Sequence, residues 1–196
     1  MTVETSLITA DEFEAYIHKP EHAERHLELI HGEIIEDMPT EEHGMIVSNI
    51  HGHLWTHVRA HKVGRVVVEV RRKADDYNVR LPDVDFTSNA RLQDRQGDEQ
   101  VVRQGPVSQM PDLAVEVQSP GQSDKLMSDK ADFYLANGTR LVWLVYPRKR
   151  LVEVRTIDDR QLLSGDERLT GGDVLPEFSM TVDDVFEGVD DLNPSD

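Results

Sequence analysis

The chain has 196 residues, of which 38% are hydrophobic and 30% are charged, and its formal net charge is −17. This length and composition fit a globular domain with a sizeable core, and no apolar run approaches the ~20 residues of a membrane span. The excess of acids argues against a protein that binds nucleic acid through general electrostatic attraction, because contacts with phosphates need Lys and Arg.

The composition also bears on compartment and domain organisation. There is no cysteine, which excludes disulfides and thiolate metal sites. The N-terminal residues lack the basic and apolar regions of a signal peptide, so we expect a cytoplasmic protein. We predict one domain over residues 1–187 and a disordered acidic tail over 188–196.

The N-terminal part predicts a helix followed by a hairpin. Thr9 suits a helix N-cap, and Phe13, Tyr16 and Ile17 give the helix after it an apolar face. Residues 27–36 form two β-rich runs on either side of His31-Gly32, a sequence typical of a tight turn.

The central part predicts an α/β (α+β) core. Thr40 caps a long helix that ends at Gly64, with an apolar stripe that includes Ile46, Ile50 and Leu54. Three strands, a helix that starts at Ser123 and ends at Asn137-Gly138, and a further strand follow it. The predicted strands of this core are 66–70, 79–86, 111–120 and 141–146. The middle strands are apolar enough to be covered on both faces.

The flanking segments are less regular. Residues 88–108 predict a long loop with at most a turn of helix. Residues 151–154 predict a hairpin partner for 141–146. A β-rich appendix, with short segments at 162–163, 171–178 and 181–186, closes the domain.

Two acids on predicted strands are the candidate metal ligands. Glu116 lies inside the apolar run 111–120, where a charge is costly unless it is paired or bound to metal. Asp83 follows Pro82 in another strand. Two adjacent carboxylates repel unless a cation neutralises them, and hard oxygen ligands favour Mg²⁺ or Mn²⁺. The alternative is that one acid pairs with an arginine such as Arg71, Arg72 or Arg80, or simply lies in solvent at a strand end.

Several other polar residues are candidates for the same site. Lys130, on the helix after Glu116, could position a water or stabilise charge on phosphate; a solvated helix lysine is the alternative reading, and Lys125 competes for the role. Glu33 directly follows the turn glycine and could approach a site at the sheet edge, whereas Glu28 is expected to face water.

All nine histidines lie between residues 18 and 61. His53, His57 and His61 recur every four residues, a spacing that can bind zinc, but no HExxH-type acid and no cysteine accompany them, so a solvated or partly buried row is the favoured interpretation. His43, at the helix start, is placed to contact the ends of the strands.

Several short segments appear in an order that resembles the Uma-type family of restriction endonucleases, a branch of the PD-(D/E)XK nuclease superfamily. The resemblance covers about residues 8–187. It is carried by 28–35, 42–44, 82–84, 111–117, Ser119-Pro120, Lys130 with Tyr134, and 175–178.

The resemblance implies a core of helix, three strands, helix and strand, and Mg²⁺-dependent hydrolysis of DNA. It implies that Asp83 and Glu116 are the metal ligands and that Glu33 is an accessory acid. The superfamily usually has a lysine where this chain has Gln118, and the resemblance implies that Lys130 takes the role of that lysine. Lys130 and Gln118 would orient the attacking water.

Cutting both strands of a duplex usually calls for two active sites, so we expect a homodimer. Because Gln118 departs from the superfamily pattern, a nuclease-like protein that binds a partner or nucleic acid without cutting is the alternative.

Overall fold

A computed structural model describes residues 7–22, 25–95 and 105–192. The chain divides into two compact units, each built from segments that are distant in sequence. The first comprises Met1–Met38, Val70–Leu81 and Gly97–Met110, and the second comprises Pro39–Glu69, Pro82–Gln96 and Pro111–Asp196. That residues 1–187 act as one domain stays a prediction.

The first unit contains the predicted helix and hairpin. Helix α1 (Ala10–Ile17) starts at a capping box in which Thr9 and Glu12 bond each other's backbone N–H groups. Strands β1 (His26–Ile30) and β2 (Glu33–Asp37) are joined at His31 and Gly32, which both have positive φ (51° and 77°), as a tight hairpin turn requires.

The same unit holds two further short strands. Strands β4 (Arg72–Asp75) and β5 (Asn78–Arg80) complete a four-stranded sheet in the order β2-β1-β5-β4. Phe13 and Ile17 of α1 pack with Leu27, Leu29 and Val79 of the sheet. A short 3-10 helix, η1 (Pro20–His22), follows α1.

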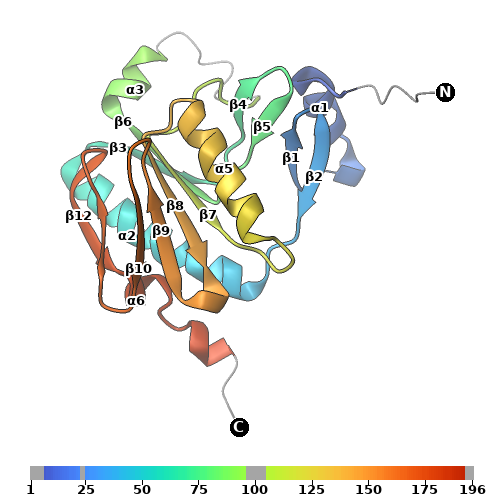
Figure 1. The fold of residues 1–196 in the computed structure, drawn as a ribbon. Coiled ribbons are helices and arrows are strands. Elements are labelled where there is room, and N and C mark those ends of the chain that lie inside the picture. The colour runs from blue at the N-terminus through green and yellow to red at the C-terminus, as the bar shows by residue number, and fades with distance from the viewer. Residues whose placement is uncertain (1–6, 23–24, 96–104, 193–196) are drawn as a thin grey trace. The chain divides into compact units, whose positions relative to one another are not determined.

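The second unit is a six-stranded sheet in the order β10-β9-β8-β7-β6-β3, with α2 on one face and α5 on the other (Figure 1). Its strands are β3 (Gly64–Val68), β6 (Val84–Ser88), β7 (Leu113–Val117), β8 (Leu141–Tyr146), β9 (Leu151–Arg155) and β10 (Arg160–Ser164).

Its helices are α2 (Glu41–His61), α3 (Asn89–Asp94), α5 (Asp124–Ala136) and α6 (Val182–Val185), with 3-10 turns η2 (Pro147–Lys149) and η3 (Val189–Leu192). A separate ribbon pairs β11 (Arg168–Gly171) with β12 (Leu175–Thr181). Among the described residues, none of the helices has both the length and the apolar character that a bilayer crossing demands.

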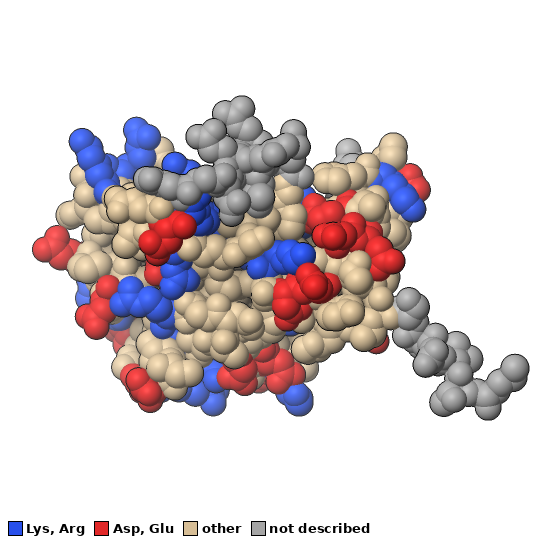
Figure 2. All heavy atoms as spheres, turned by 90° about the horizontal axis from the view of Figure 1, so that it is seen from above, with Lys and Arg blue, Asp and Glu red and all other residues tan. Residues whose placement is uncertain are grey.

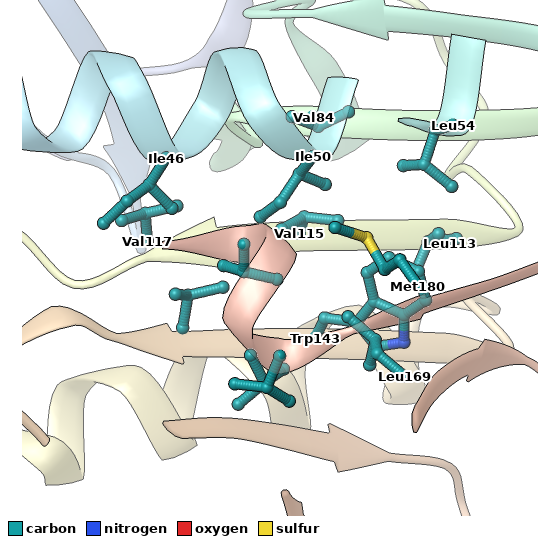
Figure 3. Close-up of a cluster of buried hydrophobic side chains, with 14 of the residues drawn as sticks. Ile46, Ile50, Leu54, Val84, Leu113, Val115, Val117, Trp143, Leu169 and Met180 are labelled. Carbon is teal, nitrogen blue, oxygen red and sulfur yellow. The ribbon is translucent and has the colours of Figure 1, made fainter. Parts of the chain in front are cut away.

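The order α2, β3, β6, β7, α5, β8 confirms the predicted core of helix, three strands, helix and strand. The apolar stripe of α2 packs on the sheet: Ile46 lies beside Val117, Ile50 beside Val115, and Leu54 on the side of Leu113 (Figure 3). Strands β7 and β8 are parallel and are joined through α5, which lies on the opposite face.

Two predicted segments differ from the structure, and one strand, β4, is not predicted. The single strand predicted over 79–86 is two strands, β5 and β6, in different sheets. The break contains Pro82, which has no N–H to give to a ladder. The predicted tail is wrong for Val189–Leu192, which forms η3 with Val189 buried.

The predicted loop over 88–108 contains a two-turn helix, α3, which starts at an N-cap hydrogen bond to the Ser88 side chain. Residues 96–104 of that loop lie outside the described residues.

Gly64 is expected to be indispensable for the packing of β3. A Cβ at this position would lie 2.3 Å from the Thr87 carbonyl oxygen and 2.6 Å from Phe86 Cε2. Because backbone cannot give way cheaply, Gly64→Ala should lower the free energy of unfolding by about 1–3 kcal/mol in urea denaturation.

The matched control is Gly52→Ala. A Cβ at Gly52, in the middle of α2, would meet no atom within 4 Å, so the helix propensity of alanine should stabilise the protein by about 0.5–1 kcal/mol. Equal effects of the two substitutions would contradict this account of Gly64.

Candidate active site

The two candidate metal ligands lie on neighbouring strands of the second unit. Val84 of β6 pairs with Val115 of β7, so Asp83, just before Val84, comes next to Glu116, just after Val115. The Asp83 N–H donates to the Val115 carbonyl (3.1 Å), and the Val117 N–H donates to Asp83 Oδ2 (2.6 Å). The Asp83 side chain therefore replaces a backbone acceptor at the point where the β6–β7 ladder ends.

Glu116 is held by α5. Because side chains alternate along β7, Val115 and Val117 enter the core beneath α2, and Glu116 points to the α5 face. There Lys130 Nζ lies 2.6 Å from Glu116 Oε2, and the Tyr134 hydroxyl donates to Oε1 at 2.6 Å. Glu116 and Lys130 are only 2% and 6% exposed, so each charge depends on the other for neutralisation.

Asp83 is held from the α2 side. His43, buried in the first turn of α2, places Nε2 3.3 Å from Asp83 Oδ1. The Thr40 hydroxyl accepts the His43 N–H at 3.3 Å and so fixes the start of the helix. The two carboxylates thus come from adjacent positions of the sheet but are held by different helical layers.

The donor set suits a hard cation. Glu116 accepts from two protein groups, and Asp83 accepts from the Val117 N–H with His43 Nε2 3.3 Å away. A carboxylate has about four lone-pair sites, so each retains capacity for a cation. Two carboxylates with water and substrate oxygens are a ligand set that Mg²⁺ accepts. Asp83 and Glu116 therefore fit Mg²⁺ or Mn²⁺ in ligand type and in their adjacency along the sheet. Across residues 7–22, 25–95 and 105–192, no three His, Asp or Glu side chains already surround one ion position.

Gln118 points away from this pair. Its amide donates to the Gln122 carbonyl (3.0 Å) and to Asp124 Oδ1 (3.2 Å), so it ties the end of β7 to the first residue of α5. Contact with the Lys149 ammonium, and secondarily with the Gln118 amide, lowers the pKa of Asp124. Gln118 is thus engaged in holding the β7–α5 connection.

A small cavity adjoins the site at the end of β7. It has a volume of about 40 Å³, room for two or three waters, and His43, Gln118, Ser119 and Arg148 are among its lining residues. Neither Asp83 nor Glu116 lines it. The cavity is therefore large enough for a few waters and too small to enclose a nucleotide.

The remaining candidates lie elsewhere. Lys125 is exposed and pairs with Asp129 at 2.6 Å, which leaves Lys130 as the lysine that reaches Glu116. Glu33 is an exposed residue of β2 in the first unit, and its accessory role stays a prediction. The expectation that Glu28 faces water is wrong: it is buried and accepts the Leu81 N–H at 2.9 Å.

One contact of the site is not predicted from the sequence: Tyr134 has no expected role, although its spacing of four from Lys130 places both on one helical face. His43 lies at the end of a strand as expected, and its partner there is Asp83, 40 positions along the chain.

A family model described as a putative restriction endonuclease, Uma2, matches residues 10–183. Among solved structures, the chain is similar to the crystal structure of a putative nuclease of family DUF820 from Anabaena variabilis. The two are 24% identical, with a TM-score of 0.76, over 93% of this chain and 99% of that one. No curated protein matches the chain. The structural likeness confirms the restriction-endonuclease-like fold.

Proposed function

The chain belongs to the Uma2 family, described as putative restriction endonucleases, and we propose that it is a nuclease that hydrolyses phosphodiester bonds of DNA with Mg²⁺, or with Mn²⁺ as a substitute. The observation that carries the proposal is the adjacency of Asp83 and Glu116 at the end of the β6–β7 ladder, with Lys130 buried against Glu116. Such an arrangement of buried charge needs a purpose, because apolar residues would fill the same space at less cost.

In this proposal Asp83 and Glu116 would hold the cation. Bound there, Mg²⁺ supplies Lewis-acid stabilisation of the charge that develops on the scissile phosphate. Lys130 and Tyr134 hold the Glu116 carboxylate in place. His43 contacts the Asp83 carboxylate from the α2 side.

Lys130 also supplies positive charge next to the reacting phosphate and is the residue we assign to orienting the attacking water. The Gln118 amide donates to Gln122 and Asp124 on the β7–α5 connection, so we assign it the positioning of that connection.

The net charge of −17 opposes general electrostatic attraction between the protein and DNA. On the face drawn in Figure 2, Lys and Arg side chains occur in small groups interspersed with Asp and Glu. General attraction to phosphates is then weak, and we expect DNA binding to depend on the divalent cation. Because duplex cleavage needs two sites, we propose that the active form is a homodimer.

The direct test incubates purified protein with duplex DNA, single-stranded DNA and RNA, in Mg²⁺, Mn²⁺ or EDTA. We expect cleavage of DNA that EDTA abolishes and that Asp83→Asn loses. Asp173→Asn, at an exposed position between β11 and β12, is the control and should cut like the wild type. Cleavage confined to RNA would overturn the assignment of DNA.

The second candidate function is binding without cleavage. It is favoured by Gln118 at the position where the superfamily keeps a lysine. Metal-dependent DNA binding by the wild type, with no more cleavage than Asp83→Asn shows, would support this candidate and reject the nuclease.

A further inference from the structure

The turn after β8 carries three consecutive cations, at residues 148–150. Strands β7 and β8 run parallel with Val117 beside Val145, so this turn lies at the edge of the sheet where β7 also ends. The proposed metal ligands Asp83 and Glu116 lie at the same edge, where the β6–β7 ladder stops. The turn therefore brings positive charge to the end of the sheet that the proposed function uses.

Two of the three cations are held by other side chains of the second unit. The Lys149 ammonium pairs with the Asp124 carboxylate and lies 4.9 Å from the centre of the Tyr146 ring. The Arg150 guanidinium pairs with Asp190 at 3.2 Å. Both cations therefore have partners within the protein.

Arg148 differs from its two neighbours. Its side chain is exposed, and within the described part of the chain its guanidinium has neither an ion pair nor a hydrogen bond. The backbone that carries it is fixed, because Pro147 restricts φ at the start of the turn and Arg150 closes the turn with a φ of 53°. An unpaired cation on a fixed turn can bind an anion without first giving up a partner or ordering the backbone.

Arg148 lines the small cavity that adjoins the catalytic residues. His43, whose Nε2 lies 3.3 Å from Asp83 Oδ1, lines the same cavity from the α2 side. Neither Asp83 nor Glu116 lines it, so Arg148 lies beside the carboxylates and not among them. An anion that Arg148 binds would therefore be a neighbour of the group held at the carboxylates, and not that group itself.

Glu42 is an acid that lines the cavity together with Arg148. It is half-buried in the first turn of α2, and the two side chains form no ion pair among the residues that the structure describes. An ion pair formed when either side chain moves is the competing role for Arg148. The substitution Glu42→Gln distinguishes this role from the binding of an outside anion.

We propose that Arg148 binds the DNA phosphate next to the scissile one and so positions the strand across the proposed metal ligands, an inference that rests on the proposed function. A guanidinium stays charged at all working pH values, and its parallel N–H groups match two oxygens of a phosphate. The chain has 38 acids against 21 Lys and Arg residues. Its contacts with phosphates must therefore come from cations that these acids leave unpaired.

The test measures the fluorescence anisotropy of a labelled DNA duplex in Mn²⁺, before cleavage proceeds, at several salt concentrations. We expect Arg148→Ala to bind about tenfold more weakly than the wild type. The slope of log affinity against log salt should fall by about 0.9, which corresponds to one phosphate contact. Arg148→Lys keeps the charge, so it should restore the slope fully and the affinity in part.

The matched control is Arg140→Ala. Arg140 is exposed and precedes β8, so this variant removes the same charge at the opposite end of the same strand and should bind like the wild type. Equal affinity and equal salt slope in Arg148→Ala and Arg140→Ala would overturn the proposal. The thermal unfolding temperature of Arg148→Ala should equal that of the wild type, because no contact within the described chain is lost.

Glu42→Gln separates the two roles of Arg148. It removes a negative charge beside the proposed phosphate site, so we expect it to bind DNA at least as tightly as the wild type. If Glu42→Gln instead loses as much affinity as Arg148→Ala, Arg148 acts through an ion pair with Glu42, and the proposal is wrong.

Single-turnover cleavage in Mn²⁺ distinguishes this inference from the proposed function. Arg148→Ala should need about tenfold more protein for its half-maximal rate, with a maximal rate within about threefold of the wild type, because contact with a neighbouring phosphate is equal before and in the transition state. If the wild type binds DNA without cutting it, the nuclease is rejected, and the anisotropy comparison still decides the role of Arg148. A wild type that binds no DNA in Mn²⁺ would overturn both.

Discussion

Glu116→Gln is expected to lower the rate of metal-dependent DNA cleavage on the order of 10³-fold, about 4 kcal/mol of transition-state stabilisation. Glutamine keeps the shape of the side chain and can still accept from the Tyr134 hydroxyl, which bonds Glu116 at 2.6 Å. It removes the negative charge that would hold the cation and faces the Lys130 ammonium. The loss is therefore one of charge more than of packing.

The measurement is the single-turnover rate in Mn²⁺ with enzyme in excess. Glu187→Gln, at an exposed position after α6, makes the same chemical change away from the site and should cut at the wild-type rate. A rate for Glu116→Gln within threefold of the wild type would remove Glu116 from the catalytic site.

Lys130→Ala is expected to lower the free energy of unfolding by about 3–5 kcal/mol, because it leaves the buried Glu116 carboxylate without its cation. Lys125→Ala, an exposed site on the same helix, should change it by less than about 0.5 kcal/mol. Urea denaturation of both variants gives the comparison.

The double variant Glu116→Gln with Lys130→Met tests the reason for that loss. It removes both charges while keeping side chains of similar length, so most of the stability should return. Cleavage should not return. A double variant as unstable as Lys130→Ala would show that packing, and not the unpaired charge, causes the loss.

The core of the fold could be predicted from the sequence because its helices and strands follow the local periodicity of apolar residues. Ile46, Ile50 and Leu54 repeat at helical spacing, and they do pack on the sheet. The apolar runs of β7 and β8 match strands covered on both faces by α2 and α5. Glu116 stood out for the same reason, as one acid inside an apolar run.

What the sequence could not predict depends on contacts between distant segments. Residues 79–86 look like one strand, yet β5 pairs with β1 and β6 pairs with β3 and β7 in a different sheet. Glu28 looks like a solvent-facing residue of an alternating strand, yet it caps the Leu81 N–H. The hydrogen bond between Gln118 and Asp124 likewise could not be predicted, because it depends on how the β7–α5 connection folds back.

The most direct measurement is calorimetric titration of Mn²⁺ into the wild-type parent chain, into Asp83→Asn and into Glu116→Gln. If Asp83 and Glu116 share a cation, the parent should bind one Mn²⁺ per chain, and each carboxylate variant should bind it at least tenfold more weakly. Equal binding by all three proteins, or none by the parent, would contradict the shared metal site on which the proposed function depends.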